Sequence, residues 1–133
     1  MAKQHGKSTV VKVGSNDVST YTNSSELTFG GDDHDTTTYG NNGHRYDGGL
    51  EDHAFKMSGL YDTTAGTGPR AVLRPLILQK AVITRRPEGT GAGKPQDVFT
   101  ALLTSYVESS PVADMVTWST EWKVDGTIDS TPQ

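Results

Sequence analysis

The chain has 133 residues, no cysteine, and twelve Lys and Arg against sixteen Asp and Glu, a formal net charge of −4 at pH 7. This length suits a single domain over residues 1–133, and the lack of cysteine excludes disulfide frameworks, thiolate metal sites and cysteine nucleophiles. No apolar run approaches the ~18 residues of a transmembrane helix, and the acidic balance argues against a protein that reads nucleic-acid sequence.

The first third of the chain predicts two strands. Valines at 10, 11 and 13 indicate a strand over residues 8–13, and 14–17 (GSND) is typical of a turn. Alternation over 24–29 then places Leu27 and Phe29 on one face and Glu26 and Thr28 on the other.

Residues 30–49 are rich in Gly, Asp and Asn and predict a long irregular loop. Loops of this length inside a small domain are usually functional or mobile. A strand is expected to resume over 50–61, with Phe55, Met57 and Tyr61 opposite Lys56 and Ser58.

One helix is predicted, over residues 67–79. Gly68-Pro69 suits its first turn, and apolar residues at 72, 73, 76 and 77 make one face. Pro75 is expected to kink the helix or end it early. A β-branched run at 81–84 predicts a further strand, followed by a glycine-rich turn.

The last third predicts a β-hairpin with strands over 97–109 and 115–124. On the first strand, Phe99, Ala101, Leu103 and Val107 are expected to share a face. The second strand alternates apolar residues, among them Trp118 and Trp122, with polar ones. Residues 1–8 and 125–133 are expected to be flexible or ordered only on assembly. The side chains expected in the core are Leu27, Phe29, Phe55, Met57, Leu73, Ile77, Phe99, Leu103, Val116, Trp118 and Trp122.

Motifs for catalysis and metal binding are incomplete. Residues 88–94 (EGTGAGK) resemble a phosphate loop, but Glu88 replaces its first glycine and Pro95 replaces the Ser or Thr that binds magnesium. Residues 32–35 (DDHD) lack the spacing of an EF-hand and are interpreted as a solvated acidic segment. No nucleophile elbow is present. We therefore expect neither enzymatic activity nor a cofactor.

The order of several short segments resembles the small tail tube (major tail) proteins of tailed bacteriophages. These segments are 17–24 (DVSTYTNS), 36–40 (TTTYG), 49–52 (GLED), 57–62 (MSGLYD), 86–89 (RPEG), 103–106 (LTSY), 109–112 (SSPV) and 116–119 (VTWS). The resemblance extends from about residue 10 to residue 126.

The resemblance implies a mainly β fold, a two-sheet β-sandwich or barrel of about six or seven strands with one flanking helix. Six subunits would form a ring in which the inner sheets join into a continuous barrel, and rings would stack into a hollow tube. Further partners would be tape measure, tail terminator and distal tail proteins, with DNA passing through an acidic lumen without specific binding and no membrane contact. The protein would be made in the host cytoplasm and reside in the virion tail.

The resemblance also implies roles for individual residues. The loop at 30–49 would contact the neighbouring ring, through Asp32, Asp33, His34, Asp35, Tyr39, Asn41, Asn42, His44, Arg45 and Tyr46. The polar strand faces are candidates for the lumen, namely Glu26, Thr28, Lys56, Ser58, Thr117, Ser119, Glu121 and Lys123.

Two alternatives remain open at this stage. The first is the inner tube of a phage-derived injection machine or gene transfer particle. The second is a monomeric ligand-binding β-sandwich, which the acidic segment and the tryptophan pair would support.

Overall fold

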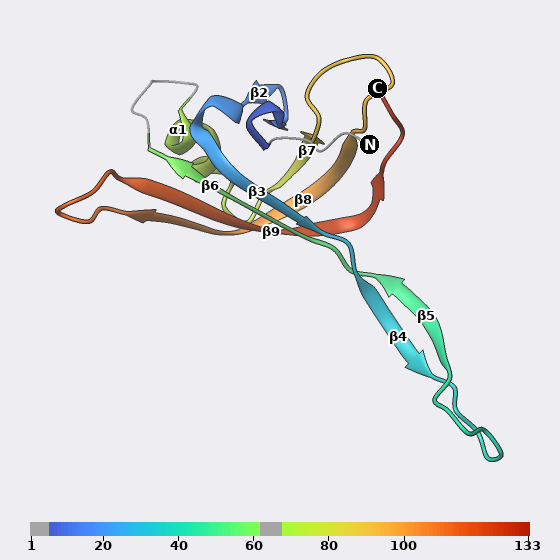
Figure 1. Ribbon diagram of the computed structural model, residues 1–133. Helices are drawn as coiled ribbons and strands as arrows, with labels where there is room; N and C mark the ends of the chain where they lie inside the picture. Colours follow the sequence, from blue (N-terminus) through green and yellow to red (C-terminus); the bar gives the residue numbers. More distant parts are fainter. Residues whose placement is uncertain (1–5, 62–67) are drawn as a thin grey trace.

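A computed structural model describes residues 6–61 and 68–133 (Figure 1). The strands are β1 (Val10–Val13), β2 (Asn16–Asp17), β3 (Thr22–Thr28), β4 (Gly31–Asp35), β5 (Tyr46–Glu51), β6 (Ala54–Leu60), β7 (Lys80–Arg86), β8 (Asp97–Ser109) and β9 (Thr117–Asp129). The helical segments are α1 (Pro69–Leu73) and 3-10 turns at Gly6–Ser8, Ser19–Tyr21 and Arg74–Leu76. The predicted fold class, mainly β with one short helix, is confirmed.

Seven strands form one antiparallel sheet in the order β2-β1-β7-β8-β9-β6-β3. The sheet is continuous and curls, so that β3, β6 and β9 lie below β2, β7 and α1 in Figure 1. The two layers meet where Arg85 Nε on β7 donates to Ser25 Oγ on β3 at 3.3 Å. One curled sheet thus supplies both layers of the expected sandwich.

The hydrophobic core fills the space between these layers. Seven of the expected core side chains are buried, namely Phe55, Met57, Leu73, Phe99, Leu103, Trp118 and Trp122. The rings of Phe55 and Phe99 pack edge to face, 5.4 Å apart. Leu27 and Ile77 are partly buried against this cluster.

Phe29 does not belong to the core, because β3 ends at Thr28 and the Phe29 side chain is 57% exposed. Val116 lies just before β9, is only partly buried and does not join the cluster. Val107 is exposed because β8 carries an extra residue, Thr104, between the pairs Leu103↔Trp122 and Ser105↔Glu121. Such a bulge exchanges the two faces of a strand, and it turns Tyr106 toward the core instead.

The helix is much shorter than the 67–79 predicted, and residue 67 lies outside the described residues. α1 ends at Leu73 and continues as the 3-10 turn Arg74–Leu76, which contains Pro75. Proline has no N–H to donate and its ring crowds the carbonyl four residues before it, so the early end expected at Pro75 is confirmed.

The C-terminal segment is ordered rather than frayed. β9 runs to Asp129, and the backbone of Gln133 exchanges hydrogen bonds with Gly93 (2.8 Å) and Lys94 (3.0 Å). Its side-chain Nε2 also donates to the carbonyl of Gly89 at 2.9 Å. Within the single chain, this segment is therefore held by backbone and side-chain hydrogen bonds instead of fraying.

Residues 30–49 are not an irregular loop. β4 and β5 pair as a separate two-stranded antiparallel sheet that projects away from the rest of the molecule (Figure 1). We call residues 31–51 the projecting hairpin. The composition misled the prediction because Gly and Asp are depleted in ordinary strands.

Candidate assembly surfaces

The eight side chains expected to face the lumen come from β3, β6 and β9, three adjacent strands. The register places Glu26 beside Lys56 and Lys56 beside Glu121, and it places Ser58 beside Ser119. Residues directly opposite each other in a sheet lie on the same face, and Trp118 and Trp122 alternate with these positions on β9. The polar residues therefore share the face that is turned away from the core.

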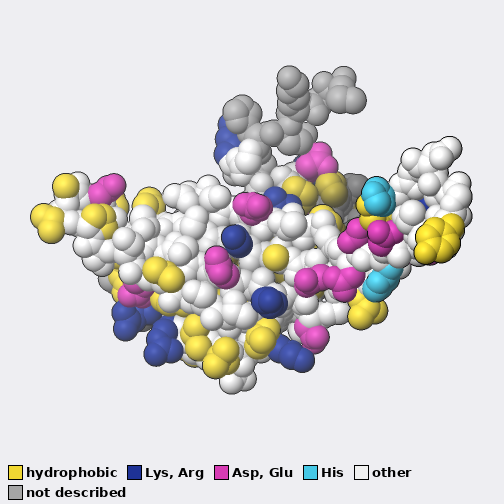
Figure 2. Space-filling view, turned by 90° about the horizontal axis from the view of Figure 1, so that it is seen from below, with side chains coloured by type: hydrophobic (Ala, Val, Ile, Leu, Met, Phe, Trp, Pro, Cys, Tyr) yellow, Lys and Arg dark blue, Asp and Glu magenta, His cyan; other side chains and the backbone are white. Residues whose placement is uncertain are grey.

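The charges on this polar face are balanced. Its two glutamates, Glu26 and Glu121, are matched by Lys56 and Lys123, and Lys56 Nζ lies 3.7 Å from Glu121 Oε1. Both partners of that ion pair are 61% exposed, so it adds little stability. Figure 2 looks onto this side of the sheet, where acidic and basic side chains alternate. The acidic surface that the resemblance implied is absent from these eight positions.

The part of the sheet that carries the polar face has an unpaired backbone edge on each side. β3 ends the sheet and pairs only with β6. β8 pairs with β7 only as far as Leu102, so its residues 105–109 pair with β9 alone. An unpaired edge is a ready template for strand addition from another chain.

The projecting hairpin has no buried residue in either strand. Asp32, Asp33, His34 and Asp35 lie on β4, Tyr46 begins β5, and Tyr39, Asn41, Asn42, His44 and Arg45 lie in the connection between them. Because an isolated two-stranded ribbon is only marginally stable in water, this hairpin needs either local polar bonds or a partner surface.

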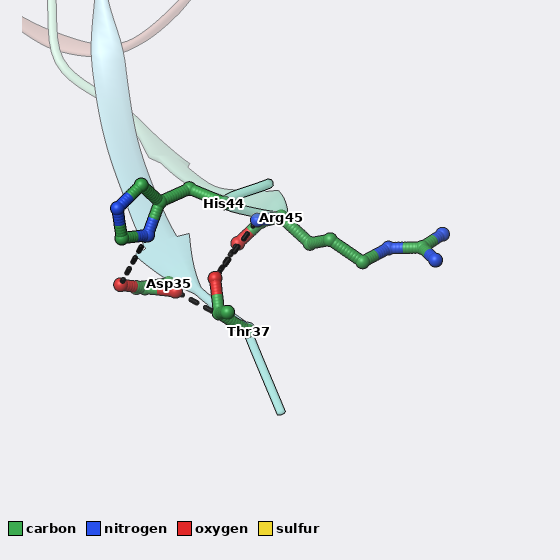
Figure 3. A network of polar contacts seen from close by, with 4 residues as sticks. All are labelled: Asp35, Thr37, His44 and Arg45. Carbon is green, nitrogen blue, oxygen red and sulfur yellow. Dashed lines mark hydrogen bonds and ion pairs between the residues drawn. The ribbon is translucent and has the colours of Figure 1, made fainter. Parts of the chain in front are cut away.

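Local bonds of this kind close the base of the connection (Figure 3). The backbone N–H of Thr37 donates to Asp35 Oδ1 at 2.9 Å, and the backbone N–H of Arg45 donates to Thr37 Oγ1 at 2.9 Å. His44 Nδ1 lies 4.0 Å from Asp35 Oδ2. The hydrogen bonds from the Thr37 side chain and backbone lower the pKa of Asp35.

His53 holds the root of the hairpin, and sequence reasoning missed it. The side chain is buried, its Nδ1 accepts a hydrogen bond from the backbone N–H of Gly30 at 3.1 Å, and its ring packs edge to face on Phe29. The signal was present, because His53 continues the buried positions 55 and 57 with a period of two. It was overlooked because a histidine does not count as apolar.

Other kinds of site are not evident in the described part of the chain. Among residues 6–61 and 68–133, no three His, Asp or Glu side chains are placed to hold a metal ion. No helix in the same ranges is long and apolar enough to cross a membrane.

Comparisons with known proteins find similarity in structure alone. No family model matches the sequence, and no curated protein does. The structure is similar to a chain of the tail of an empty gene transfer agent (GTA) particle with C6 symmetry, at TM-score 0.77 and 15% identity over 97% of this chain and 99% of that one.

Two further solved structures are similar to the same extent. A chain of the native GTA virion matches at TM-score 0.78 and 13% identity, over 97% of this chain and 99% of that one. The SPP1 tail tube matches at TM-score 0.76 and 10% identity, over 98% of this chain and 81% of that one. The chain therefore has the fold of these tail structures.

Proposed function

We propose that this chain is the structural subunit of a tail tube. Copies close into a hexameric ring, rings stack into a hollow tube, and DNA passes along the lumen without specific binding. The observation that carries the proposal is a pair of free sheet edges on either side of the strands β8-β9-β6-β3, three of which carry the polar face, in a fold shared with tail structures over nearly the whole chain.

The free edges support ring closure. Strands alternate in direction across β8-β9-β6-β3, because each neighbouring pair is antiparallel. When a second copy is rotated about an axis roughly along the strands, β3 of one copy is antiparallel to β8 of the next. The edge of β3 can then pair with residues 105–109, and a closed ring leaves neither edge exposed.

The polar face supports the lumen assignment. Its residues Glu26, Lys56, Glu121 and Lys123 have no net charge. DNA binds proteins mainly by exchanging its counterions for Lys and Arg, so a balanced surface gives little driving force for binding. Duplex DNA would therefore move along a lumen lined by this face without being retained.

The remaining parts of the proposal follow the tail likeness. The subunit is non-enzymatic, and it resides in the virion after synthesis in the host cytoplasm. The assembled tube contacts tape measure, terminator and distal tail proteins. The projecting hairpin, exposed over its whole length, is the element that reaches the next ring.

Electron microscopy of the purified protein, concentrated stepwise alongside sedimentation of the same samples, tests this function. We expect six-fold rings that stack into hollow tubes as concentration rises, with small amounts of preformed tube added as seeds if nucleation is slow. A protein that stays monomeric at every concentration, with and without seeds, would contradict it.

The likeness to two GTA structures favours a second candidate, the tube of a gene transfer particle. Both candidates share the same tube and the same assembly. Sequencing the DNA inside purified particles separates them, because a phage packages its own genome and a transfer particle packages host DNA.

A further inference from the structure

The acidic charge of this chain is concentrated on the projecting hairpin. Residues 31–51 contain five acidic residues and one basic residue, a net −4, whereas the rest of the chain contains eleven acidic and eleven basic residues, a net charge of zero. Figure 2 shows a group of Asp, Glu and His side chains at the hairpin end, whereas acidic and basic side chains are mixed over the rest of this face, with several Lys and Arg toward the other end. The hairpin thus carries the net negative charge of the chain.

A groove with two arginines lies at the other end. It is lined by Arg70, Arg74, Ile77, Tyr106 and Glu108. Arg70 Nη1 lies 3.1 Å from Glu108 Oε2, and Tyr106 OH donates to Glu108 Oε1 at 2.9 Å. The single carboxylate of the groove is thus already engaged by two of its neighbours.

Arg74 is the arginine of this groove that has no partner among the described residues. Its side chain is exposed, and no acceptor in the described part of the chain lies within hydrogen-bond or ion-pair distance of its guanidinium. A guanidinium presents several N–H donors in a fixed plane that matches a carboxylate. Among the described residues, the guanidinium of Arg74 thus has no negatively charged partner, and it lies in the same groove as the apolar side chain of Ile77.

The groove and the hairpin lie at opposite ends of β6. Ala54 begins β6 immediately after the hairpin root, and Leu60 at its other end pairs with Thr117. Ser109 continues the Leu60–Thr117 row onto β8, and Glu108, which binds Arg70, is the residue directly before it. Seven residues of strand, about 23 Å, thus separate the two surfaces along the molecule.

We infer that the Arg74 groove of one copy receives the projecting hairpin of a second copy in the next ring. This inference rests on the proposed tail tube function and adds the receiving surface. Stacking of rings with one polarity needs a head-to-tail contact, in which complementary patches lie at opposite ends of the subunit. The acidic hairpin and the arginine groove meet both requirements, charge and position.

Asp33 is the carboxylate assigned to Arg74. It lies opposite Gly48 in the hairpin, so no cross-strand side chain covers it, and it has no ion-pair partner among the described residues. Asp35, by contrast, already accepts a hydrogen bond from Thr37. Asp32 and Asp33 are therefore the acids on β4 that have no hydrogen-bond or ion-pair partner among the described residues, and Asp33, the one farther from the hairpin root, is assigned to Arg74.

Charge reversal and rescue test this contact. We expect Arg74→Glu to raise the critical concentration for tube formation about tenfold or more while single rings still form. Asp33→Arg alone should raise the critical concentration to the same extent. The double variant Asp33→Arg/Arg74→Glu restores opposite charges at the contact, so its critical concentration should return to within about threefold of that of wild type. Lys94→Glu, an equal charge change at an exposed position of the glycine-rich turn, is the matched control and should leave stacking unchanged.

The outcomes separate this inference from the function on which it rests. If Arg74→Glu forms tubes at the same critical concentration as wild type, the groove assignment alone is overturned. Loss of tubes in Arg74→Glu without recovery in the double variant would overturn the pairing with Asp33. A wild-type protein that forms no tubes under any condition would overturn the proposed function, and this inference with it.

Discussion

Gly30 and His53 are joined by a hydrogen bond from the backbone N–H of Gly30 to Nδ1 of the imidazole, 3.1 Å long. Because Nδ1 accepts, the proton of the neutral ring resides on Nε2, which lies 3.3 Å from Glu51 Oε1. A backbone bond from Asp52 N–H to the Gly30 carbonyl, 2.9 Å long, closes the same junction. Together these contacts fix where the projecting hairpin leaves the sheet.

We predict that His53→Ala lowers the free energy of unfolding by about 1–3 kcal/mol, because the Gly30 N–H loses its acceptor and the packed ring is removed. Urea denaturation of the variant measures this. Asp47→Ala is the control, since that side chain is exposed on β5 and has no hydrogen bond or ion pair with another described residue, and it should change stability by no more than about 0.5 kcal/mol. Equal stability of His53→Ala and wild type would show that the root is held by backbone bonds alone.

Gly59 allows β6 to lie close to the start of β3. A Cβ at this position would collide with the backbone carbonyl of Tyr21. We predict that Gly59→Ala destabilises the fold by about 1–3 kcal/mol, as overpacking does elsewhere. Gly43→Ala is the matched control, because a Cβ there meets nothing within 4 Å. Thermal melting of both variants checks the difference, and equal melting temperatures would mean that β3 can shift away from β6.

The connection of the hairpin should respond to acid. The hydrogen bonds of Thr37 lower the pKa of Asp35 in the folded chain below the ordinary 3.8. A depressed pKa means that the carboxylate form favours the folded connection above about pH 4, and that this contribution is lost as pH falls through the lowered value. The Asp35 carboxyl should titrate below the ordinary range by NMR.

The Thr37→Val variant should move that titration back toward the ordinary value, because the side-chain hydroxyl contributes most to the shift. Thr38→Val provides the comparison, since its hydroxyl accepts from Asn41 instead. An unaltered Asp35 titration in Thr37→Val would place the cause of the shift elsewhere.

Shortening the hairpin should separate folding from stacking. Replacing residues 33–48 by an Asn-Gly turn removes no buried residue, so we expect an unchanged melting temperature for the sheet. The same variant should form rings but no stacked tubes in electron micrographs. Tubes of normal length from this variant would show that another surface joins the rings.

The balanced charge of the polar face should keep DNA from binding. We expect negligible affinity of wild-type tubes for duplex DNA at physiological salt. The double variant Glu26→Lys/Glu121→Lys should bind it, with a log–log salt slope that steepens by about 0.9 for each phosphate neutralised. Asp17→Lys/Asp114→Lys adds the same charge on exposed positions outside these strands and should not bind DNA inside the tube. Tight, salt-steep binding by wild type would contradict a passive conduit.

Strands with strict alternation could be predicted from sequence, because each residue has the same burial as the residue two positions along. β8 has the bounds expected for it, residues 97–109. β9 begins two residues later than expected, at Thr117, and extends beyond residue 124 to Asp129. Pro75 likewise marked the early end of the helix through a local steric rule.

Features that depend on partners across the sheet could not be predicted. The extra residue Thr104 is defined only by the register against β9, and it moved Val107 out of the core. The order of 125–133 depends on Gln133 reaching residues more than thirty positions away. The assignment of His53 to the hairpin root required the position of Gly30, which the alternation of β6 alone does not supply.

The width of the polar face sets a size for the proposed ring. Strands in a sheet are spaced about 4.8 Å apart, so β3, β6, β9 and β8 together cover an arc of about 19 Å per copy. Six copies give a circumference of about 115 Å and a backbone-to-backbone diameter of about 37 Å, and strand tilt would widen it. After about 5 Å of side chain is subtracted on each side, a bore of roughly 27 Å remains. In the proposed ring, the short polar side chains of this face, Ser58, Thr117 and Ser119, would leave open a passage that larger residues would narrow.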